Sequence, residues 1–299
     1  MRLDELPRSD NVEDRRGMRM PGGRGGLGIG TVVILGLLGW WLGIDPRILI
    51  GGAEIFTGGD SSQQQTQQAP TGAPTDQTGQ FVAAVLGSTE AQWKEIFAQN
   101  GKTYEPPTLV MFSGATRSAC GFAQAAMRPF YCPNDRKVYL DTSFFADLER
   151  RFRACDADSK ACQFSQAYVI AHEIGHHVQN LLGILSRAQQ LQQRAAGGKA
   201  EANRIQVMVE LQADCLAGVW ANVENQRLAR EGKPAFIEPG DVEAALRTAA
   251  AIGDDTLQKR SQGYAVPDSF THGSSAQRQK WLTAGLKSGD INSCDTFSN

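Results

Sequence analysis

Three of the chain's four histidines lie within six residues, in the run Ala171-His172-Glu173-Ile174-Gly175-His176-His177. The His-Glu-x-x-His spacing puts His172 and His176 on one face of a helix, where one ring nitrogen of each can reach a single Zn²⁺ ion. Glu173 would lie beside this ion. A carboxylate in that place can accept the proton of a zinc-activated water and act as the general base of a hydrolysis.

The residues around this motif predict a helix with an apolar side and a metal side. The helical period turns His177 about 100° away from His176, so we expect His177 to support the site from outside or to lie at the surface. A pair of histidines on a polar surface is the alternative interpretation of the motif. The apolar side recurs at helical spacing and consists of Ile170, Ile174, Val178, Leu181 and Leu185.

A catalytic zinc ion takes three protein ligands, and the best candidate for the third is Glu210. Glu210 and Asp214 share a face of a second predicted helix, in which Ala213, Ala217 and Gly218 are small enough for close packing. Such packing would bring Glu210 to the metal. Asp214, one turn further on, could accept the remaining ring N–H of a zinc-bound histidine. The alternative is that both carboxylates are solvated charges on an amphipathic helix.

These motifs resemble those of zincin metallopeptidases with a glutamate as third ligand, and more narrowly those of the bacterial putative neutral zinc metallopeptidases. The resemblance implies a zinc-dependent peptidase fold, with one Zn²⁺ held by His172, His176 and Glu210, and with Glu173 as base. The segments that carry it are Cys120-Gly121-Phe122, Pro129-Phe130-Tyr131-Cys132-Pro133, Val138-Tyr139-Leu140-Asp141, residues 171–177, residues 210–215 and Phe270-Thr271-His272-Gly273.

Two further elements have a place in such a site. Zincins commonly stabilise the tetrahedral oxyanion with a histidine or tyrosine opposite the metal, for which His272 is our first choice and Tyr264 our second. His272 lies just ahead of a helix that Ser274 and Gln277 could cap; a structural role in the loop is the alternative. Residues 138–141 predict a strand that could pair with an extended substrate if it lies at a sheet edge, or an internal strand if it does not.

An apolar stretch near the start of the chain predicts membrane attachment. Residues 27–44 are 18 residues without a charge, which suits one transmembrane helix with Trp40 and Trp41 at its interfacial end. Six arginines in residues 1–26 would keep that segment in the cytoplasm and place the rest outside, at the inner membrane. A cleaved signal peptide and a buried soluble helix are the alternatives.

All six cysteines follow this stretch, which suits disulfides in an exported domain. Proximity along the chain suggests that Cys120 pairs with Cys132 and Cys155 with Cys162, which leaves Cys215 for Cys294. Free buried cysteines would be the better interpretation if the domain faced a reducing compartment.

The remaining sequence predicts a flexible linker followed by one domain. Residues 45–80 are rich in Gln, Gly, Ser, Thr and Pro. Residues 81–299, roughly 220 in number, suffice for a single core. We expect an α+β domain that is zincin-like and mostly helical, with helices from residue 81 and after Phe164, and a small sheet that includes residues 109–112.

Composition excludes nucleic acid as a partner, because a net charge of −2 and a pI near 6.1 provide no basic field. The sequence therefore predicts a membrane-anchored zinc peptidase that acts on a peptide or protein substrate. Three alternatives stay open: a catalytically silent zinc-binding scaffold, a zinc hydrolase of a non-peptide substrate, and a purely structural zinc site with a fourth protein ligand.

Overall fold

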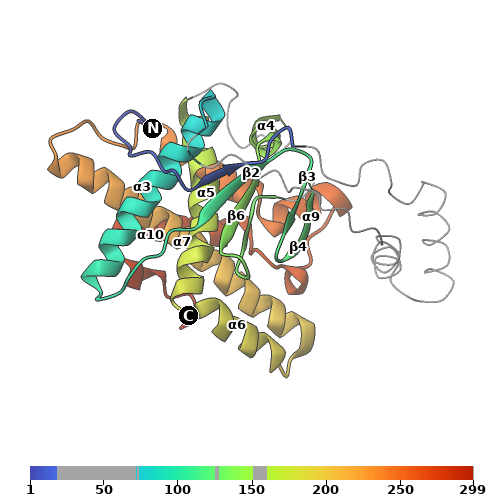
Figure 1. Cartoon of the computed structure of the whole chain (residues 1–299). Coiled ribbons are helices and arrows are strands. Elements are labelled where there is room, and N and C mark those ends of the chain that lie inside the picture. Colours follow the sequence, from blue (N-terminus) through green and yellow to red (C-terminus); the bar gives the residue numbers. More distant parts are fainter. Residues whose placement is uncertain (19–71, 73, 125–127, 151–159, 299) are drawn as a thin grey trace. The chain divides into compact units, whose positions relative to one another are not determined.

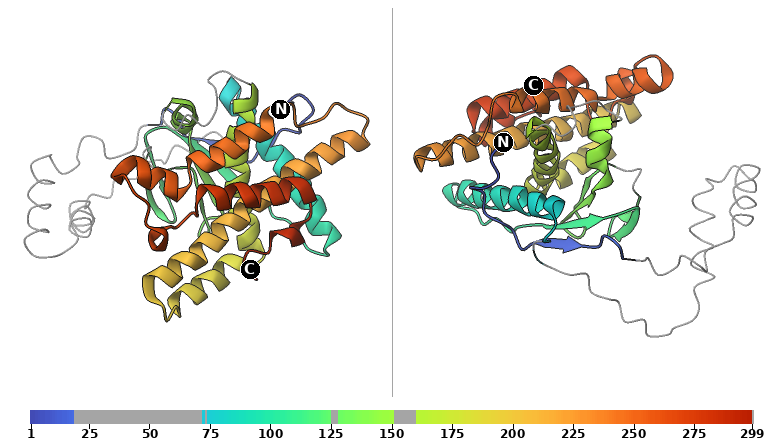
Figure 2. Two further views of the ribbon diagram at one scale, coloured as in Figure 1. Left: turned by 180° about the vertical axis from the view of Figure 1, so that it is seen from behind. Right: turned by 90° about the horizontal axis from the view of Figure 1, so that it is seen from above.

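A four-stranded sheet lies against a layer of helices (Figures 1 and 2). The computed structural model describes residues 1–18, 72, 74–124, 128–150 and 160–298. The chain divides into two units, Met1–Arg16 together with Pro70–Asn299, and Gly17–Ala69. The first unit is a mostly helical α+β fold with a small sheet, which confirms the predicted class.

The sheet has the strand order β1-β2-β6-β5, in which β1 (Val12–Asp14) and β6 (Lys137–Asp141) both run parallel to β2 (Thr108–Phe112). The short strand β5 (Phe130–Cys132) pairs with β6 in the antiparallel sense and forms one edge. Strands β3 (Ala115–Ser118) and β4 (Gly121–Gln124) make a separate antiparallel pair. Residues 138–141 are thus an internal strand, and it is β5 that lies at the edge.

Both faces of the two central strands are buried, and their sequences accordingly contain continuous apolar runs, at residues 109–112 in β2 and 138–140 in β6. Alternate side chains divide between two apolar clusters, as the period of two in a strand requires. The main core holds Leu109, Met111, Val138 and Leu140, and a second cluster holds Val110, Phe112, Cys132 and Tyr139. The prediction of a strand at residues 109–112 is confirmed.

The helices gather on one side of the sheet, as the view from above in Figure 2 shows. They bury the apolar face of the sheet and pack against one another. Their bounds are α3 (Gln77–Gln99), α4 (Ser143–Arg150), α5 (Lys160–Leu181), α6 (Ile184–Gln193), α7 (Gly198–Arg230), α8 (Asp241–Ala251), α9 (Asp254–Gln262) and α10 (Ser275–Ser288), with short 3₁₀ turns at η1 (Pro267–Ser269) and η2 (Ile291–Cys294).

Small residues let α7 approach two other helices closely. A Cβ atom on Gly175 of α5 would lie 3.1 Å from the Cα atom of Ala213, so these two helices cross with no room for a larger residue. Gly218 meets α10 instead, opposite Gly285, where a Cβ on either glycine would collide with backbone. Ala213 therefore brings α7 to the histidine helix, as expected, whereas Gly218 serves the contact with α10.

The start of α10 follows from local sequence. The Ser274 side chain accepts a hydrogen bond from the backbone N–H of Gln277, and the Gln277 side chain accepts one from the backbone N–H of Ser274. This is the predicted capping box, and it satisfies two N–H groups that the helix itself leaves without partners. It also fixes the end of the loop that carries His272.

Residues 1–16 pack in the same unit as the helices, whereas the sequence analysis placed residues 1–26 in a segment apart from the domain. Val12 lies opposite Leu109 in the sheet, and Leu6 and Val12 are buried in the main core. The sequence hides this strand because it is three residues long and two of them are acidic. Only its pairing with β2 identifies it.

The predicted membrane span at residues 27–44 and most of the predicted linker lie outside the described residues. None of the helices that the structure does describe is long and apolar enough to span a membrane. Helix α3 begins at Gln77, four residues before the predicted start of the domain at residue 81.

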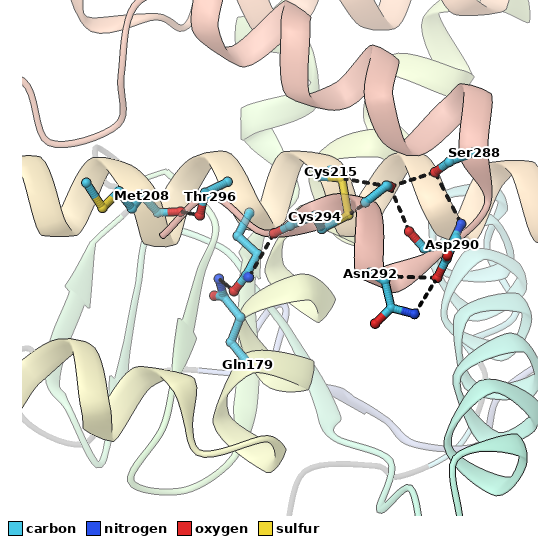
Figure 3. Close-up of a disulfide and its surroundings, with 10 residues drawn as sticks. Gln179, Met208, Cys215, Ser288, Asp290, Asn292, Cys294 and Thr296 are labelled. Carbon is cyan, nitrogen blue, oxygen red and sulfur yellow. Dashed lines mark hydrogen bonds between the residues drawn. A yellow bond between two sulfur atoms is a disulfide. The ribbon is translucent and has the colours of Figure 1, made fainter. Parts of the chain in front are cut away.

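Two of the three expected disulfides are present. Cys120 is bonded to Cys132 and Cys215 to Cys294. The third expected pair includes Cys155, which lies outside the described residues. The Cys215–Cys294 bond attaches η2 at the end of the chain to the middle of α7 (Figure 3).

His177 is fully buried between α5 and the edge strand, which excludes the surface, one of its two expected positions. Its Nε2–H donates to the backbone oxygen of Glu105 at 2.7 Å, and its Nδ1 accepts from the Tyr131 hydroxyl at 3.0 Å. Asn180, also on α5, donates to the same hydroxyl. These bonds hold β5 against α5, and burial favours the neutral imidazole, whose Nδ1 is free to accept.

We expect His177 to make stability depend on pH. Burial lowers the pKa of this imidazole to about 4, against about 6.5 in the unfolded chain. The unfolded state therefore binds more protons between these values, so the contribution of His177 is complete above about pH 6.5. It falls by about 3 kcal/mol as the pH drops toward 4. Denaturant unfolding of metal-free wild type and His177→Gln across pH 4–7.5 should give a shallower slope for the variant. Equal slopes would contradict this.

Candidate metal centre

Helices α5 and α7 bring three ligand side chains together. The donor atoms of His172, His176 and Glu210 all lie within 4.8 Å of one another. The Oε2 atom of Glu210 is 3.2 Å from Nε2 of His172 and 3.5 Å from Nε2 of His176. Two imidazole nitrogens and one carboxylate oxygen are a donor set that zinc takes in hydrolytic sites, so these residues fit the ion that the sequence predicts.

Asp214 fixes the ring orientation of His172. The Nδ1 atom of His172 lies 2.8 Å from Oδ1 of Asp214, a carboxylate with no exposed surface. Nδ1 therefore carries the proton and donates it to the carboxylate, which leaves the lone pair of Nε2 for a metal ion. The structure places Asp214 where the sequence analysis expected it.

Asp214 is itself held by two buried side chains that the sequence analysis did not identify. Arg278 of α10 donates to both of its carboxylate oxygens at 2.8 Å, and the Tyr168 hydroxyl donates to Oδ1 at 2.6 Å. Burial alone would raise the pKa of Asp214, but Arg278 and His172 keep it well below its usual range. A signal for Arg278 exists in the sequence, because it shares the helical face of Trp281, Leu282 and Gly285. An arginine on a buried helical face requires a buried anion.

The second histidine is oriented by an amide. Nδ1 of His176 lies 2.9 Å from Oε1 of Gln179, and the Gln179 amide donates to the backbone oxygen of Val209 and to Oε1 of Gln212. Gln212 donates in turn to the backbone oxygen of Cys294. Because Gln179 uses its N–H groups on these partners, its oxygen accepts from His176, and Nε2 of His176 is left for the metal. Figure 3 shows this connection between Gln179 and the C-terminal disulfide.

The negative charge of Glu210 favours protonated imidazoles at the two histidines. Burial disfavours the charged imidazolium of His172, but Asp214 and Glu210 raise its pKa to about 10. Burial likewise opposes the charge on Glu210, yet His176 and His172 hold its pKa well below the usual range. A metal cation would therefore compete with protons for these nitrogens, since either one compensates the buried negative charge of Glu210.

Glu173 points into an open cavity of about 710 Å³ that the three ligands also line. Its side chain is buried, with 7% of the residue exposed. Burial raises the pKa of this carboxyl, and the neighbouring His172 and His176 only partly offset the effect. A carboxylate with a raised pKa, beside the ligand set and open to the cavity, is suited to accept a proton from water.

The two candidates for oxyanion stabilisation lie in different surroundings. His272 lines the same cavity, and its Nδ1 is 3.3 Å from Oδ1 of Asp254. Oδ2 of Asp254 accepts from the backbone N–H groups of residues 271–273, so one carboxylate fixes both the loop and the ring. Tyr264 is 62% exposed and does not line this cavity. Asp254 lies 18 residues before His272, and no local pattern connects them.

Comparison with known proteins gives matches along almost the whole chain. Residues 1–297 match the family described as putative neutral zinc metallopeptidase. The uncharacterized protein YpfJ of Escherichia coli K12 is 46% identical over 308 residues, which cover 99% of both chains. The uncharacterized protein Rv2575 of Mycobacterium tuberculosis H37Rv is 41% identical over 262 residues, 86% of this chain and 84% of its own. No solved structure matches significantly.

We expect Asp214→Asn to weaken zinc binding by about 10- to 100-fold, because His172 loses the carboxylate that fixes its tautomer. Glu224→Gln is a matched control: Glu224 is also a buried carboxylate of α7 paired with an arginine, Arg227, but it does not contact the ligands. It should lower the free energy of unfolding and leave zinc affinity unchanged. Competition with a chromogenic chelator measures both affinities. Equal losses in the two variants would show that general destabilisation, not ring orientation, is the cause.

Proposed function

Because the chain belongs to the family of putative neutral zinc metallopeptidases, we propose that it is a zinc-dependent peptidase with Glu173 as its general base. One observation supports this above the others. His172, His176 and Glu210 converge in a cavity that also exposes a separate buried carboxylate, Glu173. A zinc site with a purely structural role would need a fourth protein ligand, and no fourth His, Cys, Asp or Glu joins the group among the described residues.

In this proposal the three ligands bind the zinc ion, and their supporting residues fix the orientation of the two histidine rings. His172 and His176 each present Nε2, because Asp214 and Gln179 bind the opposite ring nitrogen. When bound, the zinc ion supplies Lewis-acid chemistry, which lowers the pKa of water and polarises a carbonyl. The peptide-bond carbonyl and the attacking water would share the side of the cluster that opens to the cavity.

Glu173 moves the proton. Its carboxylate accepts the proton of the attacking water and then delivers it to the nitrogen of the departing amine, as peptide hydrolysis requires. The raised pKa of this carboxyl helps the first transfer, because a more basic carboxylate accepts a proton from water more readily. Atoms balance: one water is consumed and one carboxylate and one amine are formed.

His272 and the free edge of β5 would position the substrate. Asp254 and Thr271 both lie at Nδ1 of His272, and Nε2 has no partner among the described residues, so this nitrogen is available to donate to a developing oxyanion. Phe130 and Tyr131 of β5 line the cavity, and no strand of the described chain pairs with the outer edge of β5. An extended peptide can add to such an edge by main-chain hydrogen bonds.

The proposal predicts that substitution of the base removes activity, whereas substitution of a ligand removes the zinc ion. In the full-length chain, Glu173→Gln should keep one zinc ion per chain and lose at least about 10³-fold in peptide hydrolysis, because only the proton acceptor is removed. Glu210→Ala should lose most of the zinc. Metal analysis and cleavage of a mixed peptide library measure the two effects. Hydrolysis that persists in Glu173→Gln, or a wild type without zinc, would contradict the assignment.

A second pair of variants tests the oxyanion role. His272→Gln should reduce kcat by about 10²- to 10³-fold with zinc retained, as the loss of one oxyanion donor does elsewhere. Tyr264→Phe removes a hydroxyl that lies outside the cavity, and it should change kcat by less than about 2-fold, within the usual range for surface substitutions. If Tyr264→Phe gave the larger loss, the two assignments would have to be exchanged.

A further inference from the structure

Arg128 lines the cavity beside the metal ligands and has little to bind there. It lies two residues before β5, next to Pro129, and both residues belong to the cavity wall. Its side chain is half-buried. A guanidinium group carries five N–H donors and always bears a positive charge. A cation in this position needs anions or carbonyl oxygens around it.

The described part of the chain gives Arg128 one weak partner. Nη1 donates to the backbone oxygen of Ile252 at 3.4 Å, which is at the long limit for such a bond. No carboxylate forms an ion pair with Arg128 among the described residues. Burial lowers the pKa of the guanidinium and Arg278 adds repulsion, so its charge is poorly compensated.

The nearest carboxylates are already engaged. Asp254, Glu210 and Glu173 all attract the charge of Arg128 at a distance. Asp254 binds His272 and three backbone N–H groups, and Glu210 faces both metal-binding histidines. Glu173 faces the cavity and acts on water in the proposed function. None of these three carboxylates forms a hydrogen bond or ion pair with Arg128, so most donors of this guanidinium remain available to a molecule in the cavity.

We propose that Arg128 binds a carboxylate group of the substrate and so sets which peptides the site accepts. The free donors of a guanidinium form a planar fork that matches a carboxylate in two hydrogen bonds. Because Arg128 lies two residues before β5, a peptide added to the edge of that strand would lie close to this guanidinium. This inference rests on the proposed peptidase function. The carboxylate is either the C-terminal group of the peptide or an acidic side chain.

The test measures binding, so that it does not depend on turnover. Zinc-loaded full-length Glu173→Gln is titrated with a peptide that ends in a free carboxylate and with its C-terminal amide, and then with an amidated peptide that carries Glu and its Gln counterpart. We expect at least one carboxylate to improve affinity by about 10- to 100-fold over its neutral partner, the range of a charged hydrogen-bonded pair. A preference for the free C-terminus indicates an exopeptidase, and a preference for Glu indicates an acidic cleavage motif.

Two variants in the same background complete the experiment. Arg128→Gln should abolish the preference and keep zinc, whereas Arg187→Gln should keep both, because Arg187 is an exposed arginine beside the cavity wall that does not line it. A preference that survives Arg128→Gln, or no difference within either peptide pair, overturns the inference. If wild type cleaves peptides without such a preference, only this inference fails. If the preference depends on Arg128 but wild type cleaves nothing, the proposed function fails and the binding site stands.

Discussion

The charge of Asp214 is the constraint on which the arrangement of the helices depends. A carboxylate without exposed surface is stable only if its charge is paired and its oxygens are hydrogen-bonded. Asp214 of α7 meets this condition through residues of two other helices: Arg278 on α10, and Tyr168 and His172 on α5. Close contact of α7 with α10 at Gly218 and Gly285 makes the pairing with Arg278 possible. The same contacts that neutralise one buried charge thus orient a metal-binding ring.

The two histidines of the motif depend on different parts of the molecule. His172 is oriented by a buried ion pair, whereas His176 is oriented by the neutral amide of Gln179. Gln179 is connected through Gln212 to the backbone of Cys294, which the disulfide to Cys215 holds against α7. The orientation of His172 therefore depends on the packing of α10, and the orientation of His176 depends on the C-terminal tail. Damage to either support would affect the same ion.

Local patterns in the sequence predicted the features that lie within one helical turn. His172, Glu173 and His176 are such a set, as are Glu210 with Asp214 and the capping box of Ser274 with Gln277. Features that depend on tertiary contacts could not be predicted in this way. Asp254 reaches the loop of His272 across 18 residues, and the identity of the edge strand depends on how β5 turns back onto β6. For His177, the angle on α5 correctly excluded a place among the metal ligands, but it left the surface open because it could not reveal strand β5 on the other side.

The pairing of β1 with β2 restricts which side of a membrane these two segments can occupy. Segments that share a hydrogen-bonded sheet lie in one aqueous compartment, so residues 1–16 and 70–299 are on the same side of any bilayer. Any attachment of the chain to a membrane must leave these two strands together on that side.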